Sequence, residues 1–477
     1  MTSASGTKGD QNEGQILSTN QKALKINLDL IRYGTFAEIG AGQEVARCFF
    51  MVGGAAGTIA KSTSAYDMAI SDAIYGPSKR YVSRDRLQKM LDCEHAIILD
   101  KLGPARGAAT AFFTFADTVS ARNFRGTNEC HGWMGVKYQA HPLEPDSQIL
   151  IHVRMLDAQN NLQQDALGIV GVNLLYAAFY FRETPHRMLE SLLDNLSKER
   201  VEIDMVEFSG NDFKHVDNRA VSLKLVQLGL TGAAMFGPTG EVLQPSEVLR
   251  KKPVLVERGS FRPVTKVNID IIDCALKEFS EDLGVAPDQV VELMEINLRQ
   301  LLVDGKLDLA DFLARADLLA AAGKIVLVSN YFEYYRLACY LARYTSEPIA
   351  VTMGVSSLLD VFKEEYYSGL EGGILEAFGK LFTKNMRIYV YPYRDPVSGA
   401  MQSADTVAIP DGQRNIFAHL KERGRIQAIR SFDESLLHIF SRDVLQRIQD
   451  GDAAWESMVP EEIAAVIKTH RFFGYRG

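Results

Sequence analysis

The amino-acid sequence predicts an α/β protein with two domains, the second of which is a doubly wound parallel sheet. Two observations lead to this fold class. The chain has 477 residues, and a single hydrophobic core rarely serves more than about 250–300 residues. From residue 251 onward, short β-rich runs alternate with amphipathic helical patterns. Strands that are separated by helices pair in parallel, with helices on both faces of the sheet.

Residues 1–25 are expected to form a disordered tail. They are rich in Ser, Gly, Asn and Gln, and a segment of this composition cannot bury enough apolar surface to fold. The same residues contain no apolar run of the kind that a secretory signal peptide needs.

Residues 26–250 are expected to form a mixed α/β domain, whose role the sequence leaves open. Ala111–Asp117 and Gln148–Met155 have the length and the β-formers of strands, whereas Arg84–Leu102 and His186–Leu196 have helical patterns. The charged stretch Pro245–Pro253 is closed by proline and marks the expected boundary with the second domain.

Residues 251–477 contain the regular alternation. Apolar residues spaced three and four apart predict a helix over Ile269–Leu283, and Gly284 is a natural stop for it. The remaining expected strands are Val254–Glu257, Lys324–Ser329, Pro348–Thr352 and Met386–Tyr391. The remaining expected helices are Val290–Leu302, Leu309–Ala321, Tyr331–Arg343, Ser356–Phe362 and Ile374–Phe382, and further helices are expected in the last 65 residues.

Composition argues against several classes of partner. The net charge is −8, whereas proteins that bind nucleic acids usually carry a basic field. No apolar stretch reaches the roughly 18 residues that suggest a membrane-spanning helix. The five cysteines are scattered and form no CxxC pair, which favours reduced thiols in the cytoplasm over disulfides or a metal site.

The motif with the most specific chemistry lies at the first strand-to-helix turn of the second domain, Gly259-Ser260-Phe261-Arg262-Pro263. Glycine lets the backbone approach a phosphate closely, and the helix that follows presents its positive end to an anion. The polar side chains nearest this turn are Arg258, Ser260, Arg262 and Lys266.

This turn resembles that of the nucleotidyltransferases that adenylylate nicotinamide mononucleotide, and in particular the subgroup with threonine at the first histidine of the HxGH signature. In that alignment Thr265 takes the threonine position, Val267 the glycine position and Asn268 the second histidine position. The resemblance implies a Rossmann-like nucleotidyltransferase fold and ATP with Mg²⁺ as cofactors. The nucleotide-binding residues that it implies are Gly259, Ser260, Phe261, Arg262, Thr265, Lys266 and Asn268.

Over its whole length, the chain also resembles a family of uncharacterised bacterial proteins that are often labelled nicotinamide mononucleotide adenylyltransferase. Some of them carry the label TonB-dependent receptor, which implies a membrane protein that this sequence does not predict.

Asn268 departs from the family pattern at the position of the family's histidine. An amide donates a hydrogen bond but carries no charge, and the loss of one charge-stabilising donor costs about 3–4 kcal/mol of transition-state stabilisation, or roughly 10²–10³ in rate. The sequence also contains no segment like ISSTxxR, which the family uses for the triphosphate. The resemblance therefore implies a nucleotidyltransferase-like protein with impaired or lost catalysis.

Two alternatives stay open. One is a non-catalytic scaffold that keeps the fold and self-associates, and a homo-oligomer is expected in either case. The other is an unrelated enzyme with its site in the first domain, near Gly40–Gly57 or Asn128–Trp133.

Further candidates lie in that first domain. Asp117 ends an apolar run, as a helix cap or a metal ligand does, while His131, His141 and His152 are too widely spaced to predict a metal site. A further hypothesis is an internal duplication, in which Gly34-Thr35-Phe36 repeats the turn at Gly259.

Overall fold

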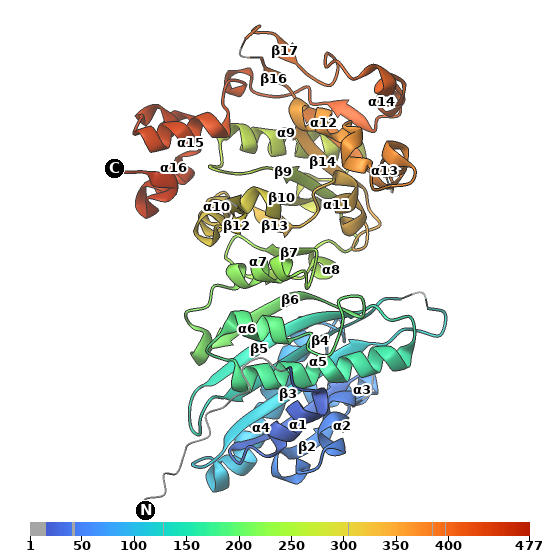
Figure 1. Ribbon diagram of the computed structural model, residues 1–477, viewed down its shortest axis with the longest axis vertical. Helices are drawn as coiled ribbons and strands as arrows, with labels where there is room; N and C mark the ends of the chain where they lie inside the picture. The colour runs from blue at the N-terminus through green and yellow to red at the C-terminus, as the bar shows by residue number, and fades with distance from the viewer. Residues whose placement is uncertain (1–15, 41–42, 127, 304, 384, 396) are drawn as a thin grey trace, which may run out of the picture. The chain divides into compact units, whose positions relative to one another are not determined.

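A computed structural model describes residues 16–40, 43–126, 128–303, 305–383, 385–395 and 397–477 (Figure 1). The chain divides into unit 1, which ends at Val216, and unit 2, which runs from Asp217 to Gly477. This division falls well before the boundary expected between residues 250 and 251. The reason is that strand β7 (Ala233–Phe236) pairs with β13 (Ile325–Ser329), which places it in the sheet of unit 2.

Unit 1 begins with helix α1 (Thr19–Asn27), part of which lies in the expected disordered tail. Ser18 and Gln21 form a capping box at its start, which satisfies amide groups that the first helical turn would otherwise leave without partners. The side chain of Lys22 is buried and donates hydrogen bonds to Asn173 and Asp194. The tail expected over residues 1–25 is therefore wrong for residues 18–25, and residues 1–15 lie outside the described part of the chain.

The sheet of unit 1 has the order β2-β1-β3-β4-β5-β6, with β1 parallel to β2 and β3 and the remaining pairs antiparallel. Its strands are β1 (Arg32–Ile39), β2 (Ile59–Thr63), β3 (Ala111–Ser120), β4 (Cys130–Gln139), β5 (Asp146–Met155) and β6 (Val201–Gly210). Its other helices are α2 (Glu44–Met51), α3 (Met68–Tyr75), α4 (Arg84–Arg106), α5 (Asn160–Tyr180) and α6 (Pro185–Ser191). Unit 1 therefore combines helices with a sheet of mixed parallel and antiparallel strands.

Helices α4 and α5 lie on opposite faces of this sheet. Thr114 of β3 contacts His95 of α4, whereas the neighbouring Phe113 contacts Phe179 of α5. Successive residues of a strand point to opposite faces, so the two helices enclose the sheet between them.

The hypothesis of an internal duplication is wrong. Residues 34–36 lie inside strand β1, whereas their proposed counterparts at residues 259–261 form a loop after a strand. The two sheets also differ in topology, because three of the five strand pairs in unit 1 are antiparallel.

The sheet of unit 2 has the order β18-β15-β14-β9-β10-β13-β7-β8. All pairs from β18 to β13 are parallel, and the pairs of β7 are antiparallel. Counted along the chain from β9, the six parallel strands have the order 3-2-1-4-5-6, which is the doubly wound Rossmann arrangement. The other strands are β8 (Val242–Leu243), β9 (Val254–Arg258), β10 (Val291–Asn297), β14 (Ile349–Gly354), β15 (Arg387–Tyr391) and β18 (Ile426–Ala428).

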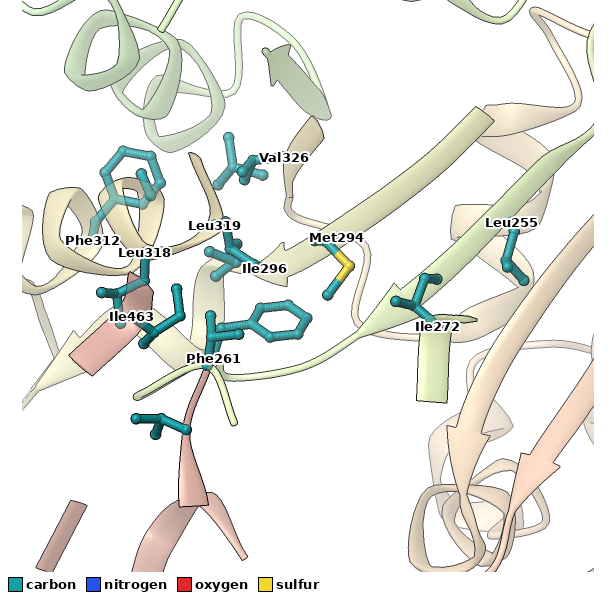
Figure 2. Close-up of a cluster of buried hydrophobic side chains, with 14 of the residues drawn as sticks. Leu255, Phe261, Ile272, Met294, Ile296, Phe312, Leu318, Leu319, Val326 and Ile463 are labelled. Carbon is teal, nitrogen blue, oxygen red and sulfur yellow. The ribbon is translucent and has the colours of Figure 1, made fainter. Parts of the chain in front are cut away.

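Each face of this sheet has its own hydrophobic core. Leu255 of β9 belongs to a cluster that includes Ile272 of α9 (Lys266–Leu283) and Phe312 of α10 (Leu309–Ala321), and Figure 2 labels these residues. The neighbouring Val256 belongs to a second cluster, which includes Leu358 of α12 (Val355–Val361). Helices therefore cover both faces, which confirms the predicted fold class. The other helices of unit 2 include α11 (Tyr334–Leu341), α13 (Gly373–Leu381), α14 (Arg414–Glu422), α15 (Ser441–Asp450) and α16 (Glu461–His470).

One expected helix of unit 2 is a strand. The segment predicted as a helix over Val290–Leu302 forms β10, which pairs on one side with β9 and on the other with β13. An apolar run between two buried strands gains more from completing the sheet than from its helical propensity, because tertiary context overrides local preference.

Within the described residues, no helix combines the length and apolar character that crossing a membrane requires.

Candidate functional site

The predicted motif loop lies at the carboxyl end of β9 and leads into α9. Strand β9 pairs with β14 on one side and with β10 on the other. The strand order reverses between β9 and β14, and open α/β sheets bind ligands beyond the carboxyl ends of their strands at such a switch point. The loop therefore stands where this fold places its ligands.

Two residues of the loop are committed to packing. Phe261 is fully buried, has a left-handed φ of 47°, and belongs to the hydrophobic core beneath the loop (Figure 2). A Cβ on Gly259 would lie 2.7 Å from the ring of Phe261. Glycine is therefore required at position 259 because the aromatic ring occupies the space beside it.

Two further residues of the motif form the helix cap. Thr265 is buried and caps α9 in a capping box with Asn268. The amide oxygen of Asn268 accepts hydrogen bonds from the backbone N–H and the hydroxyl of Thr265, and its amide nitrogen donates to Glu257 over 2.9 Å. Both ends of the Asn268 side chain are thus engaged within the protein.

Glu257 is buried at the end of β9, 3% exposed. Burial raises the pKa of this carboxyl to about 8, although the hydrogen bond from Asn268 works in the opposite direction. The group is therefore mostly protonated at neutral pH, and a neutral carboxylic acid beside the motif adds no negative charge that would repel a phosphate.

Of the remaining three predicted residues, Arg262 forms an ion pair within the protein, whereas Ser260 and Lys266 are exposed. Arg262 forms an ion pair with Asp311 over 2.6 Å, and Asp311 also pairs with Arg315. The side chains of Ser260 and Lys266 are exposed beside the loop. Of the seven predicted site residues, these two have side chains exposed at the surface of the loop.

A cavity of about 180 Å³ opens at the same edge of the sheet. It is lined by residues at or beyond the carboxyl ends of β9, β10 and β13 and by residues of α12. Its principal polar and aromatic residues are Arg258, Asn297, Arg299, Phe332, Tyr334, Asp360 and Tyr366.

Arg258 forms a fixed wall of this cavity. Its guanidinium contacts both carboxylate oxygens of the fully buried Glu295 at 2.5 and 3.1 Å, and it donates to the carbonyl oxygens of Tyr331 and Phe332. Its charge is therefore balanced inside the protein. Its planar group lies over the ring of Tyr334, 4.5 Å from the ring centre.

Arg299 supplies a charge that faces outward. It is exposed, and its guanidinium stacks on Phe332 at 4.1 Å from the ring centre. Among the described residues it forms no ion pair. The two acids in the cavity wall have cationic partners, since Glu333 pairs with Arg336 and Asp360 with Lys363. The cavity thus combines one available guanidinium with aromatic rings, which suits a ligand that carries both an anionic group and a planar ring.

Sequence reasoning found Arg258 but missed the rest of this cavity. Its residues come from four separate segments that only the sheet brings together. The signal that could reveal them is their position after parallel strands, and the prediction of a helix over Val290–Leu302 hides this position for the residues that follow β10.

Unit 1 contains a line of hydrogen-bonded titratable groups across three strands. The carboxylate of Asp204 lies 2.6 Å from Nδ1 of His152, and Nε2 of His152 lies 3.0 Å from Nδ1 of His131. His152 and Asp204 are buried, while His131 is partly exposed. Burial lowers the pKa of His131 to about 4, with a further contribution from His152. The strands bring together His131 and His152 of the three predicted histidines, whereas His141 contacts Arg182 instead.

Asp117 is not at the end of its strand. It lies inside β3, 1% exposed, and in register with Glu38 of β1. Burial raises the pKa of Asp117 well above its usual range, and the neighbouring Glu38 raises it further. Glu38 accepts hydrogen bonds from the backbone amides of Val45 and Ala46 at the start of α2. Among the described residues, no group of three or more His, Cys, Asp or Glu could hold a metal ion.

No protein-family model matches the chain, and no curated protein matches its sequence. Among solved structures, the nicotinic acid mononucleotide adenylyltransferase of Plasmodium falciparum, complexed with NaAD, is 9% identical. Its alignment covers 47% of this chain and 98% of that chain, with a TM-score of 0.29.

Two further neighbours are competence/damage-inducible proteins. CihA from Agrobacterium tumefaciens is 16% identical, and its alignment covers 33% of this chain and 94% of that chain, with a TM-score of 0.25. A CinA superfamily protein from Escherichia coli is 15% identical and covers 36% of this chain and 98% of its own, with a TM-score of 0.23. At these TM-scores, the neighbours identify neither a ligand nor an activity for this chain.

Proposed function

We propose that unit 2 binds a nucleotide at the carboxyl edge of its parallel sheet, as a nucleotidyltransferase-like protein in which adenylyl transfer is impaired or lost. The observation that carries this proposal is the position of the motif loop. The loop and the cavity beside Arg258 both stand at the carboxyl ends of β9 and its neighbours, where the doubly wound fold binds its ligands.

The chemistry of the cavity supports a ligand with a phosphate and a planar base. Arg299 offers a guanidinium that no described carboxylate neutralises, and Phe332 and Tyr334 offer aromatic faces. Ser260 and Lys266 extend the polar surface on the side of the motif loop. A nucleotide of the nicotinamide mononucleotide or ATP type has the matching groups.

Magnesium fits this arrangement only as an ion that is bound mainly by the phosphates of the ligand. Glu257 is buried and bonded to Asn268, and Glu295 is bonded to Arg258, so neither carboxylate is available as a ligand. Glu333 and Asp360 line the cavity and are the carboxylates that would share a phosphate-borne ion. Mg²⁺ commonly binds through one or two carboxylates together with substrate phosphates.

The engagement of Asn268 supports impaired catalysis. The family's histidine would act on the phosphate, whereas the amide oxygen of Asn268 is hydrogen bonded within the helix cap and its amide nitrogen is hydrogen bonded to Glu257. A catalyst that relied on this position would lose about 3–4 kcal/mol of transition-state stabilisation. If no nucleotide binds, the alternative function that remains is a self-associating scaffold that retains the fold.

A thermal-shift screen with ATP, nicotinamide mononucleotide and NAD, each with and without Mg²⁺, tests the proposal. A ligand at about 100 times its dissociation constant should stabilise the native state by roughly 2.7 kcal/mol. A saturable rise in melting temperature with any of the three supports nucleotide binding. The absence of a rise with all three rejects it.

The line Asp204–His152–His131 supports a second candidate, an acid–base enzyme with its site in unit 1. In this line, a buried carboxylate orients one imidazole, and that imidazole contacts a second, partly exposed one. Such a line of groups can move a proton between the interior and the surface. The distances of 2.6 and 3.0 Å allow such a transfer. This candidate requires that the ring of His131 exchanges its proton during the reaction, and NMR of the His131 ring nitrogens tests whether that ring changes its protonation state.

A further inference from the structure

A second and larger cavity of unit 2, of about 710 Å³, lies at the opposite edge of the same sheet. Arg387 is the first residue of β15, and Arg425 immediately precedes β18, so the cavity opens at the amino ends of these parallel strands. The end of α14 adds His419 and Arg423, and the last turn of α9 adds Asp282. This place is separate from the candidate nucleotide site, which lies at the carboxyl ends.

The lining of this cavity is strongly cationic. The residues of the described chain that line it include three arginines and one histidine but a single carboxylate, that of Asp282. One oxygen of Asp282 accepts hydrogen bonds from Arg387 and Tyr389, each over 2.6 Å, and from Gln427 over 2.9 Å. This oxygen of Asp282 is therefore bonded to Arg387 and its neighbours, and among the described residues Asp282 forms an ion pair with Arg387 but with neither of the other two arginines.

Arg425 is held firmly in this wall. Its backbone N–H donates to Leu420 and its carbonyl accepts from Ile388, both over 2.8 Å, while its guanidinium donates to the carbonyl of Met386. Its neighbour Arg423 closes α14, beside Gly424 in the left-handed conformation with φ of 63°. Neither guanidinium forms an ion pair with a carboxylate of the described chain.

Two arginines that line one cavity create a positive potential there, which attracts an anion. Guanidinium groups bind phosphate oxygens through paired hydrogen bonds. The cavity volume far exceeds the space that one phosphate fills, and Phe382 and Leu420 form its apolar part. These features together favour a ligand with more than one anionic group.

We propose that this cavity is a binding site for an oligophosphate, a ligand with two or more linked phosphate groups that Arg423 and Arg425 bind. Free polyphosphate and the phosphate chain of a nucleotide share this chemistry. The site goes beyond the proposed nucleotide site, because none of its residues lines the cavity at Arg258. Helix α9 runs from the motif cap to this cavity, since Asp282 lies in its last turn.

Isothermal titration calorimetry of the full chain with sodium tripolyphosphate tests the proposal. The double variant Arg423→Ala/Arg425→Ala should bind tripolyphosphate at least ten-fold more weakly than the unmodified protein. Arg414→Ala is the matched control, because Arg414 lies on the same helix α14 and is 67% exposed. The control should retain the affinity, as should Arg299→Ala at the other cavity.

Unchanged affinity in the double variant overturns the proposal, and so does an equal loss in Arg414→Ala, which would indicate a general charge effect. Loss of binding in Arg299→Ala with retention in the double variant also overturns it, because tripolyphosphate would then occupy the other cavity. If the double variant unfolds, the exposed single variant Arg423→Ala replaces it, with a weakening of at least three-fold expected. A second titration with ATP distinguishes the two sources of the phosphates. If ATP and tripolyphosphate bind with equal affinity, the phosphate chain is the whole ligand. If ATP binds more tightly and Arg423→Ala abolishes that binding, the ligand is a nucleotide.

Discussion

The side-chain amide of Asn268, at the start of helix α9, donates a hydrogen bond over 2.9 Å to the buried carboxyl group of Glu257, at the end of strand β9. The same side chain completes the cap of α9 with Thr265. Asn268 therefore connects the start of helix α9 to the end of strand β9.

We expect Asn268→Ala to destabilise unit 2 by about 1–3 kcal/mol, because it removes the helix cap and leaves Glu257 without its donor. Urea unfolding followed by circular dichroism measures the change. Asn415→Ala, an exposed position on α14, is the control and should stay within about 0.5 kcal/mol of the unmodified protein. Equal stabilities for the two variants would contradict the tie between helix and strand.

Glu257 should make stability depend on pH. Its pKa in the folded protein is raised from 4.5 to about 8, so the folded state holds a proton that the unfolded state releases. The contribution is greatest below about pH 4.5, is lost as pH rises through 8, and amounts to at most roughly 5 kcal/mol. Glu257→Gln should remove this slope and be the more stable protein at pH 8. Parallel pH profiles for the two proteins would show that Glu257 does not titrate in this range.

Gly259 should tolerate no side chain. A Cβ at this position would lie 2.7 Å from the ring of Phe261, so Gly259→Ala must displace a fully buried aromatic residue at a cost of about 1–3 kcal/mol. Gly369, beside which a Cβ would meet no atom within 4 Å, provides the control Gly369→Ala. Thermal unfolding of both variants measures the difference. An unchanged melting temperature for Gly259→Ala would mean that the ring of Phe261 can move aside without cost, which contradicts the prediction.

His131 should remain neutral over most of the acid range, because its pKa is lowered to about 4. The unfolded state takes up a proton near pH 6.5, so the contribution of His131 to stability is present above that pH and is lost as pH falls through 4. NMR titration of the ring nitrogens should place the midpoint of His131 near pH 4, well below the ordinary value of 6.5. A midpoint of His131 near 6.5 would contradict the buried line of groups.

The sequence predicted the fold of unit 2 well because periodicity and local turn chemistry are local properties. The helix ending at Gly284 and the strand ending at Arg258 follow directly from them. It failed for β10, since a run such as VVELMEIN carries the same apolar residues in a helix or in a strand and only its two neighbours decide.

The site was predicted less completely. The motif loop lies at the correct edge, but packing decides the roles of its residues, and no local pattern shows that the ring of Phe261 turns into the core. Arg299 and Phe332 meet only because β10 and β13 are neighbours in the sheet. The line from His131 to Asp204 likewise depends on the register of three strands.

The central claim is that a nucleotide binds beside Arg299 at the carboxyl edge of unit 2. Calorimetric titration with nicotinamide mononucleotide and with ATP in Mg²⁺ should show saturable binding that Arg299→Ala weakens at least ten-fold. Arg447→Ala, at an arginine of α15 that is half-buried and pairs with Asp452, should bind as the unmodified protein does. If Arg299→Ala binds both nucleotides with unchanged affinity, or if the unmodified protein binds neither, the claim is contradicted.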